Sequence, residues 1–179
     1  MTIDCETDPF KAGRIPQPFI WGCYDGRDND YREFATAGEL VAYLRELDVI
    51  VYAHNGGRFD FHFLREHIDS DRQIMLIGGR IAKFYIGAAE FRDSMNILVN
   101  PLRAFAKDEI DYAKLEARVR RHHMPEIRRY LRSDCVNLWD TIKKYFDTYG
   151  RSLTQAGADR KSTRLNSSHG MSSRMPSSA

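Results

Sequence analysis

Two carboxylates stand one residue apart at the start of the chain, in the stretch Thr2–Thr7, "TIDCET". Side chains alternate between the two faces of a strand, so Asp4 and Glu6 would share one face, with Ile3 and Cys5 on the other. Two like charges on one face repel each other unless a cation lies between them or water screens them. The pair therefore indicates either a cation site or an exposed strand end that runs into the turn "TDPF".

A third acid, Asp60, follows the glycine turn of "HNGGRFD" and stands at the start of an expected helix. An acid at this position also stabilises the exposed N–H groups of the first helical turn, so capping is an alternative to catalysis. Asn55, beside Gly56 and Gly57, fits a turn equally well.

A fourth acid, Asp134, interrupts an apolar stripe on a long expected helix, "EIRRYLRSDCVNLWD", at a position where the period calls for a hydrophobe. A buried unpaired charge costs several kcal/mol or shifts its pKa, so Asp134 requires a partner. A metal ion would serve, and so would one of the arginines nearby, which are Arg128, Arg129 and Arg132. Tyr130 lies one turn earlier on the same helical face and can present its hydroxyl beside Asp134.

The elements that must position these residues alternate between strand and helix patterns. Strands are predicted at 2–7, 16–26 and 49–54, two or three more within 72–94, and helices at 39–47, 59–68 and 125–149. The segment 101–112 mixes helix and loop signals. In the order of these elements, strands come first and strand–helix alternation follows. This order favours an α/β domain built on a mixed sheet.

Length and composition suit one folded domain, with 179 residues and 42% hydrophobic content. No apolar run approaches the ~20 residues that span a bilayer, and no secretory signal is predicted. The three cysteines, Cys5, Cys23 and Cys135, form no CxxC pair, so a zinc knuckle or disulfide framework is not indicated and a cytosolic location is expected.

The net charge of +2 depends on the last 21 residues, because the first 158 hold 23 basic and 24 acidic residues. Global charge thus argues neither for nor against nucleic acid. The serine-rich tail, 159–179, is expected to be disordered. Its wording, "DRKSTRLNSSH" and then "SRMPSSA", resembles a translated sequencing adapter, so we expect it to be an artefact.

Together "IDCET", "HNGGRFD" and "YLRSD" resemble the ExoI, ExoII and ExoIII motifs of the DEDDy 3′–5′ exonucleases, in order and at suitable separations. A tyrosine four residues before Asp134 is typical of the DEDDy branch. This resemblance implies an RNase H-like (DnaQ-like) α/β fold, with a mixed five-stranded sheet flanked by helices.

Further stretches are similar to the proofreading domain of protein-primed family B DNA polymerases of phages and linear plasmids. "FRDSMNILVNPL", "DEIDY" with "AKLE", and "SLTQAG" all resemble segments of that family, so the resemblance extends over 1–158. It implies an exonuclease domain at 1–150 and, at 151–158, the start of a connection to a polymerase domain. The motifs of polymerisation are absent from the chain. The segment before "DEIDY" is shorter than the family's, which leaves open whether Lys107 is the family's site lysine.

The resemblance implies that two Mg²⁺ or Mn²⁺ ions hydrolyse the phosphodiester at a single-stranded DNA 3′ end. Asp4 would bridge both ions, Glu6 and Asp134 would complete the site of the water-activating ion, and Asp60 would serve the other. Tyr130 would orient the attacking water. The positions that match the family's contacts to the DNA strand are Thr7, Asn55, Phe59, Ser94, Met95 and Tyr112. Phe59 and Met95 are equally compatible with plain core positions.

The sequence thus predicts the N-terminal fragment of a DNA-directed DNA polymerase with proofreading chemistry. The expected partners are a single-stranded DNA 3′ end, the polymerase domain of the same chain and a terminal (priming) protein, in the cytoplasm of a host cell. Two alternatives stay open: a stand-alone DEDDy exonuclease or exoribonuclease, and a catalytically silent RNase H-like module that only binds nucleic acid or a partner.

Overall fold

The computed structural model describes residues 1–26, 30–98, 110–151 and 154. Seven strands lie in this part of the chain: β1 (Thr2–Thr7), β2 (Pro18–Tyr24), β3 (Tyr31–Phe34), β4 (Ile50–Ala53), β5 (Met75–Ile77), β6 (Arg80–Ile86) and β7 (Ala89–Asp93). The two α-helices are α1 (Ala37–Leu44) and α2 (Arg120–Tyr149). Short 3₁₀ helices complete the description: η1 (Gly56–Arg58), η2 (Asp60–His67), η3 (Ser94–Asn96) and η5 (Tyr112–Leu115).

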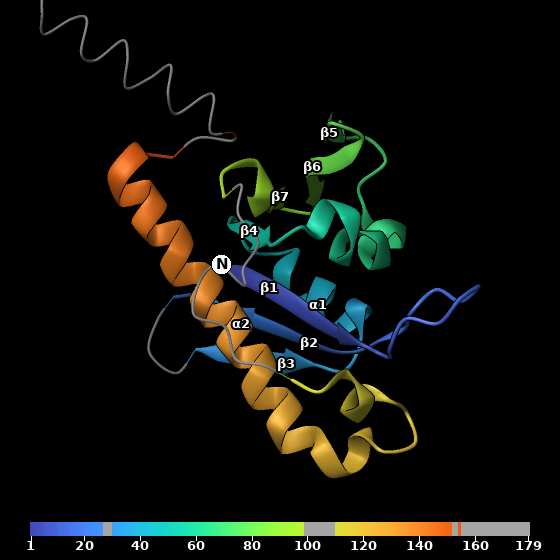
Figure 1. Cartoon of the computed structure of the whole chain (residues 1–179). Helices are drawn as coiled ribbons and strands as arrows, with labels where there is room; N and C mark the ends of the chain where they lie inside the picture. Colours follow the sequence, from blue (N-terminus) through green and yellow to red (C-terminus); the bar gives the residue numbers. More distant parts are fainter. Residues whose placement is uncertain (27–29, 99–109, 152–153, 155–179) are drawn as a thin grey trace, which may run out of the picture.

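All seven strands form one mixed sheet in the order β3-β2-β1-β4-β7-β6-β5 (Figure 1). β1 pairs with β4 in parallel, and β4 pairs with β7 in parallel, whereas the outer pairs are antiparallel. The carboxyl ends of β1, β4 and β7 therefore lie at one edge of the sheet, the place where open α/β sheets bind ligands.

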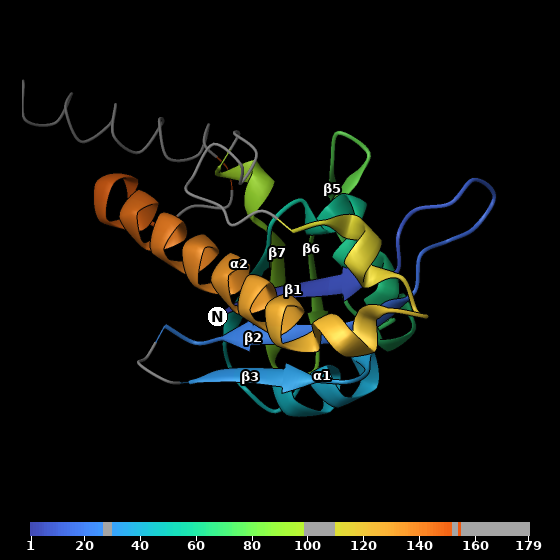
Figure 2. The same ribbon diagram turned by 60° about the horizontal axis from the view of Figure 1, so that its bottom comes forward.

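Helices cover both faces of the sheet. The long helix α2 packs across β1 and β2 on one face, and α1 lies on the opposite face with η2 (Figures 1 and 2). Strand alternation explains the two cores: Ile3 and Cys5 join the cluster around α1, whereas Tyr52 of β4 packs with Leu138 and Ile142 of α2. The face of β1 that bears Asp4 and Glu6 is thus the face that meets α2.

The predicted α/β class and mixed sheet are confirmed, but the predicted number of five strands is wrong. The edge strands β3 and β5 are four and three residues long. Such short strands pair on one side only and leave little alternation in the sequence, so β3 is not predicted as a separate strand, whereas β5 lies within 72–94, where two or three strands are predicted.

Helix boundaries also differ from the sequence prediction. The expected helix 39–47 begins earlier, because the Thr36 hydroxyl accepts the backbone N–H of Glu39 at 3.2 Å and caps α1. The expected helix 59–68 is the 3₁₀ helix η2. The long helix starts at Arg120, so Pro125 lies inside α2 near its amino end. Most of 101–112 and the tail 159–179 lie outside the described residues.

Among the described residues, α2 is the longest helix, and neither it nor any other helix is apolar enough over sufficient length to span a membrane.

Candidate metal centre and nucleic-acid interface

Three carboxylates from two distant parts of the chain meet between β1 and α2. One oxygen each from Asp4, Glu6 and Asp134 lies within 4.8 Å of the other two. Glu6 and Asp134 are 6% and 4% exposed, and Asp4 is half-buried. Crowded, buried negative charges repel strongly, and an oxygen-only donor set matches the preference of hard divalent cations such as Mg²⁺ and Mn²⁺. The residues present therefore fit a divalent metal site.

The inward position of Asp134 agrees with the prediction from the helical stripe. Asp134 is buried between Leu131 and Leu138, which both face the sheet. Two of the arginines weighed as alternative partners have other contacts: Arg128 pairs with Glu33 at 3.1 Å, and the Arg132 guanidinium lies 5.7 Å from the centre of the Tyr31 ring.

A buried hydrogen bond fixes α2 against β1 beside this group. The hydroxyl of Thr2 donates to the carbonyl oxygen of Cys135 at 2.8 Å. Thr2, Asp4 and Glu6 are every second residue of β1 and lie on the same face of the strand. Cys135 follows Asp134 directly on α2. The bond thus sets the separation of the strand and the helix that carry the three carboxylates.

The fourth expected acid, Asp60, lies outside this group of three. Asp60 is 2% exposed, and its Oδ1 accepts a hydrogen bond from Cys5 Sγ at 3.2 Å. Cys5 points to the face of β1 opposite Asp4 and Glu6, towards the α1 core. Burial raises the pKa of Asp60 to about 6, although the hydrogen bond from Cys5 acts in the other direction. Asp60 stands in the first turn of η2, whose N-cap residue Phe59 makes no side-chain capping bond.

One buried acid at the same edge was missed by sequence reasoning. Asp93, 1% exposed at the end of β7, accepts the backbone N–H groups of Gly57 at 3.3 Å and Met95 at 3.0 Å. Burial raises the pKa of Asp93. The bond from Gly57 joins the turn after β4 to the end of β7, and the bond from Met95 caps η3. The available signal is an acid at an inward position of "AEFRD", where alternation otherwise places Ala89 and Phe91.

The turn after β4 approaches its neighbour closely, which explains the glycine at its centre. A Cβ on Gly57 would lie 2.1 Å from the carbonyl oxygen of Ile81. Asn55, two residues earlier, adopts a left-handed conformation with φ of 59°. His54 Nδ1 lies 2.9 Å from the Ser94 hydroxyl, a bond between the residues that directly follow β4 and β7.

Most of the residues expected to contact a DNA strand lie at or just after the carboxyl ends of β1, β4 and β7, whereas Tyr112 belongs to η5. Ser94 and Thr7 are buried, Met95 and Phe59 are half-buried, and Tyr112 on η5 is 65% exposed. The parallel ends of β4 and β7 bring Asn55 and Ser94 together although 39 positions separate them in the sequence.

Two further residues, Tyr130 and Lys107, are expected in the site from the sequence. Tyr130 is 6% exposed and packs in a cluster with Ile20 and Leu131. Lys107 lies outside the described residues.

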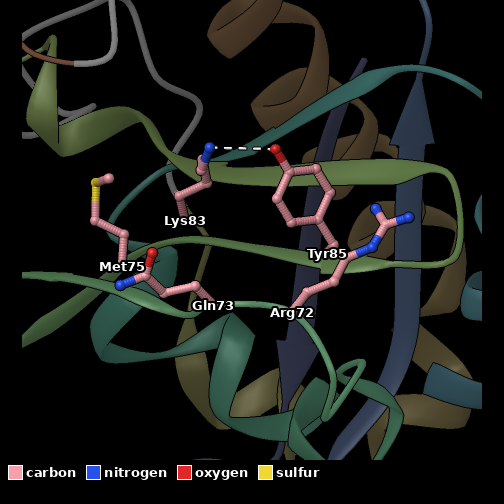
Figure 3. Close-up of a pocket in the computed structure, with 5 residues that line it drawn as sticks. All are labelled: Arg72, Gln73, Met75, Lys83 and Tyr85. Atoms are coloured by element: carbon pink, nitrogen blue, oxygen red, sulfur yellow. Dashed lines mark hydrogen bonds between the residues drawn. The ribbon is translucent and has the colours of Figure 1, made fainter.

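A separate cavity of about 390 Å³ lies at the far end of the sheet (Figure 3). Its lining residues are Arg72, Gln73, Met75, Lys83 and Tyr85. Lys83 Nζ bonds to the Tyr85 hydroxyl at 3.2 Å and lies 3.8 Å from Glu90. The cavity contains none of the carboxylates described above, so the candidate site is the edge formed by β1, β4 and β7.

The fold and the site define a class of protein: an α/β domain whose mixed sheet holds an acidic, metal-compatible group where parallel strands end. Comparison with known proteins agrees with this class. No protein-family model matches the sequence. The DNA-directed DNA polymerase of Enterobacteria phage PRD1 is 41% identical over 161 residues, which cover 87% of this chain and 28% of that polymerase.

Solved structures of polymerases share the fold. Phi29 DNA polymerase complexed with single-stranded DNA matches with a TM-score of 0.74 and 17% identity, over 99% of this chain and 37% of the polymerase. The family B DNA polymerase of Pyrobaculum calidifontis matches with a TM-score of 0.64 and 16% identity, over 88% of this chain and 26% of the polymerase. Homology to the PRD1 polymerase and the fold shared with phi29 polymerase support the conclusion that this chain corresponds to the N-terminal region of a protein-primed family B DNA polymerase. The chain spans about 28% of the PRD1 polymerase.

Proposed function

We propose that this chain carries metal-dependent 3′–5′ exonuclease chemistry, which removes nucleoside monophosphates from single-stranded DNA 3′ ends within a DNA-directed DNA polymerase. The observation that carries the proposal is the meeting of Asp4, Glu6 and Asp134 within 4.8 Å. Buried like charges this close require compensation by a cation, opposite charges, hydrogen bonds or protonation, and an oxygen-only donor set suits a divalent cation.

In this proposal Asp4, Glu6 and Asp134 hold divalent ions, Mg²⁺ or Mn²⁺, and Asp60 contributes from the start of η2, beside the opposite face of β1. Bound ions of this kind supply an activated water and stabilise the departing 3′ oxygen. Tyr130, one helical turn before Asp134, orients the attacking water through its hydroxyl. A phenol suits a positioning role, because its ordinary pKa near ~10 makes it a poor general base at neutral pH.

The DNA strand would lie across the edge formed by the ends of β1, β4 and β7. Thr7, Asn55, Ser94, Met95 and the aromatic rings of Phe59 and Tyr112 offer hydroxyl, amide, thioether and stacking contacts there. Unpaired bases stack on aromatic side chains, and polar groups bind sugar and phosphate. Lys107 is kept as a candidate for the site lysine of the family. The polymerase domain of the same chain, a terminal protein and a cytoplasmic location in a host cell complete the proposal.

Digestion of a 5′-labelled single-stranded DNA oligomer by the full chain tests this function. With Mg²⁺ or Mn²⁺ we expect a ladder that shortens from the 3′ end, and with EDTA no digestion. Asp4→Asn and Asp134→Asn should lower the rate at least about a hundredfold, since each removes a charged ligand of the proposed ions. Asp140→Asn is the matched control, because Asp140 is an exposed acid on the same helix as Asp134.

The result that would contradict the proposal is folded wild-type protein that digests no DNA with either metal. An RNA oligomer of the same sequence separates the alternatives, since a ribonuclease recognises the 2′-hydroxyl. Rapid digestion of RNA but not DNA would favour the exoribonuclease. Binding without digestion of either would favour the silent nucleic-acid-binding module.

A further inference from the structure

An exposed phenylalanine stands beside the candidate DNA interface. Phe10 lies in the loop between β1 and β2 and is 74% exposed. Its ring centroid lies 5.5 Å from that of Phe59, and the two ring planes are inclined by 42°. Phe59 directly precedes Asp60. A single exposed apolar side chain is ordinary on a protein surface, so the meaning of Phe10 depends on how its loop is held and on what its ring adjoins.

Buried and ionic contacts hold the loop at its base. Asp8 is 5% exposed; its N–H donates to the carbonyl oxygen of Gln17 at 3.1 Å, and its carboxylate accepts from Gln17 N–H and from the Arg14 guanidinium. Figure 2 shows this loop projecting beyond the end of β1. Nearer the tip, Lys11 Nζ lies 3.1 Å from Glu116. The loop is therefore anchored at both ends of the segment that carries Phe10.

Phe10 is the solvent end of a row of aromatic rings. Phe59 meets Phe63 edge to face at 5.2 Å between centroids, and Phe63 meets Trp21 at 6.5 Å. Trp21 is fully buried in the core. The row thus runs from the buried Trp21 to the exposed Phe10, and the ring contacts of Phe59 and Phe63 support Phe10 from inside the protein.

The two cations of the loop already have anionic partners in the protein. Arg14 pairs with Asp8 and Lys11 pairs with Glu116. What the loop offers to a ligand at this edge is therefore an aromatic face rather than a free positive charge.

We propose that Phe10 is a base-stacking residue for the single-stranded DNA 3′ end and extends the aromatic platform begun by Phe59. This inference rests on the proposed function and adds a substrate contact that the motif residues do not include. Stacking on an aromatic side chain tolerates any base, because every base has a π-face. Phe10 therefore raises the affinity for unpaired 3′ nucleotides without selecting sequence.

Binding of a fluorescent single-stranded DNA oligomer to the full chain in EDTA, measured by anisotropy, tests the inference without hydrolysis. We expect Phe10→Ala to weaken binding by roughly 5- to 150-fold, the range for the loss of one base–aromatic stack. Phe10→Trp should retain the affinity. Ile15→Ala is the matched control, since Ile15 lies in the same loop with the same exposure of 74% and makes no ring contact in the described structure. It should change the affinity less than twofold.

Two further readouts separate stacking from other causes. An oligomer with abasic sites in place of its last three nucleotides should bind wild type and Phe10→Ala equally, because no base remains to stack. The dependence of log affinity on log salt concentration should be unchanged in Phe10→Ala, since no phosphate contact is lost. Because Phe10 is exposed, the melting temperature should not change.

The inference is overturned if Phe10→Ala binds as wild type does, if its loss persists with the abasic oligomer, if Ile15→Ala loses as much, or if wild type binds no oligomer. Failure of the proposed exonuclease function gives a different result: the wild type binds DNA with the predicted dependence on Phe10 but digests none with Mg²⁺ or Mn²⁺. Digestion by both proteins with equal KM leaves the exonuclease intact and removes the role of Phe10.

Discussion

At the scale of single residues, the candidate site combines acids in two electrostatic settings. Asp4, Glu6 and Asp134 form a group whose oxygens lie close enough together for one divalent cation to offset their repulsion, whereas Asp60 lies against the thiol of Cys5 in the core. Burial of an acid without a cation favours its neutral form. Asp60 is therefore an acid whose protonation should have a measurable effect on the stability of the metal-free protein.

In metal-free protein we expect the free energy of unfolding to fall as the pH rises from about 4 to 6. The folded pKa of Asp60 is about 6 against an ordinary value of 3.8, so within this window the folded state binds more protons than the unfolded state. The loss is up to about 3 kcal/mol. Urea unfolding of wild type and Asp60→Asn across this range measures the difference, and the variant, which cannot ionise, should show a smaller decline. A decline of equal size in both proteins would contradict the assignment to Asp60.

At the scale of elements, β1 and α2 are the pair whose relative position decides whether the carboxylates meet. The two elements lie at opposite ends of the described chain, and the buried bond between Thr2 and the Cys135 carbonyl joins them at 2.8 Å. On the other side of the site, Asp93 joins the turn after β4 to the end of β7. Hydrogen bonds between elements, rather than bonds within them, thus shape the site.

The variant Thr2→Val should show whether this hydrogen bond affects metal binding at the site or only the stability of the fold. Valine has the shape of threonine but lacks the hydroxyl, so we expect a loss of about 1–2 kcal/mol in the free energy of unfolding and an increase in the Mg²⁺ concentration needed for half-maximal thermal stabilisation. Thr2→Ser keeps the hydroxyl and should keep the wild-type Mg²⁺ dependence even if its melting temperature is lower. An unchanged Mg²⁺ midpoint in Thr2→Val would show that this bond contributes to stability alone.

At the scale of the whole molecule, one sheet separates two cores. Trp21 is buried in the core around α1, and Trp139 of α2 meets the ring of Tyr24 edge to face at 6.3 Å. Since β2 and β4 supply side chains to the clusters on both faces, neither side can persist when the sheet is lost. The described structure should therefore unfold as one cooperative unit.

The two tryptophans provide a direct test of this cooperativity. Trp139→Phe leaves Trp21 as the fluorescent probe of one face, and Trp21→Phe leaves Trp139 as the probe of the other. In each variant the fluorescence and far-UV circular dichroism midpoints in urea should coincide, although the two variants need not be equally stable. Separate midpoints within either variant would indicate that the two faces unfold independently.

The sequence by itself determined the α/β class, most of the elements and the acids of the candidate metal group. Period-2 and period-3.6 patterns depend only on which local face is buried, so they are visible in Thr2–Thr7 and in the stripe through Leu131, Asp134 and Leu138. The short edge strand β3 was not predicted as a separate strand, because it pairs on one side only and leaves little alternation in the sequence.

Only the tertiary structure decided which of these residues meet. Asp4 and Asp134 share no local pattern, and the crossing of α2 over β1 brings them together, whereas Asp60 is held by Cys5 on the other face. The roles of Asp93 and Phe10 likewise arise from turns and loops that adjoin one another through parallel strand ends and aromatic packing. Contacts between segments distant in the chain depend on packing of the whole sheet, and no local periodicity records them.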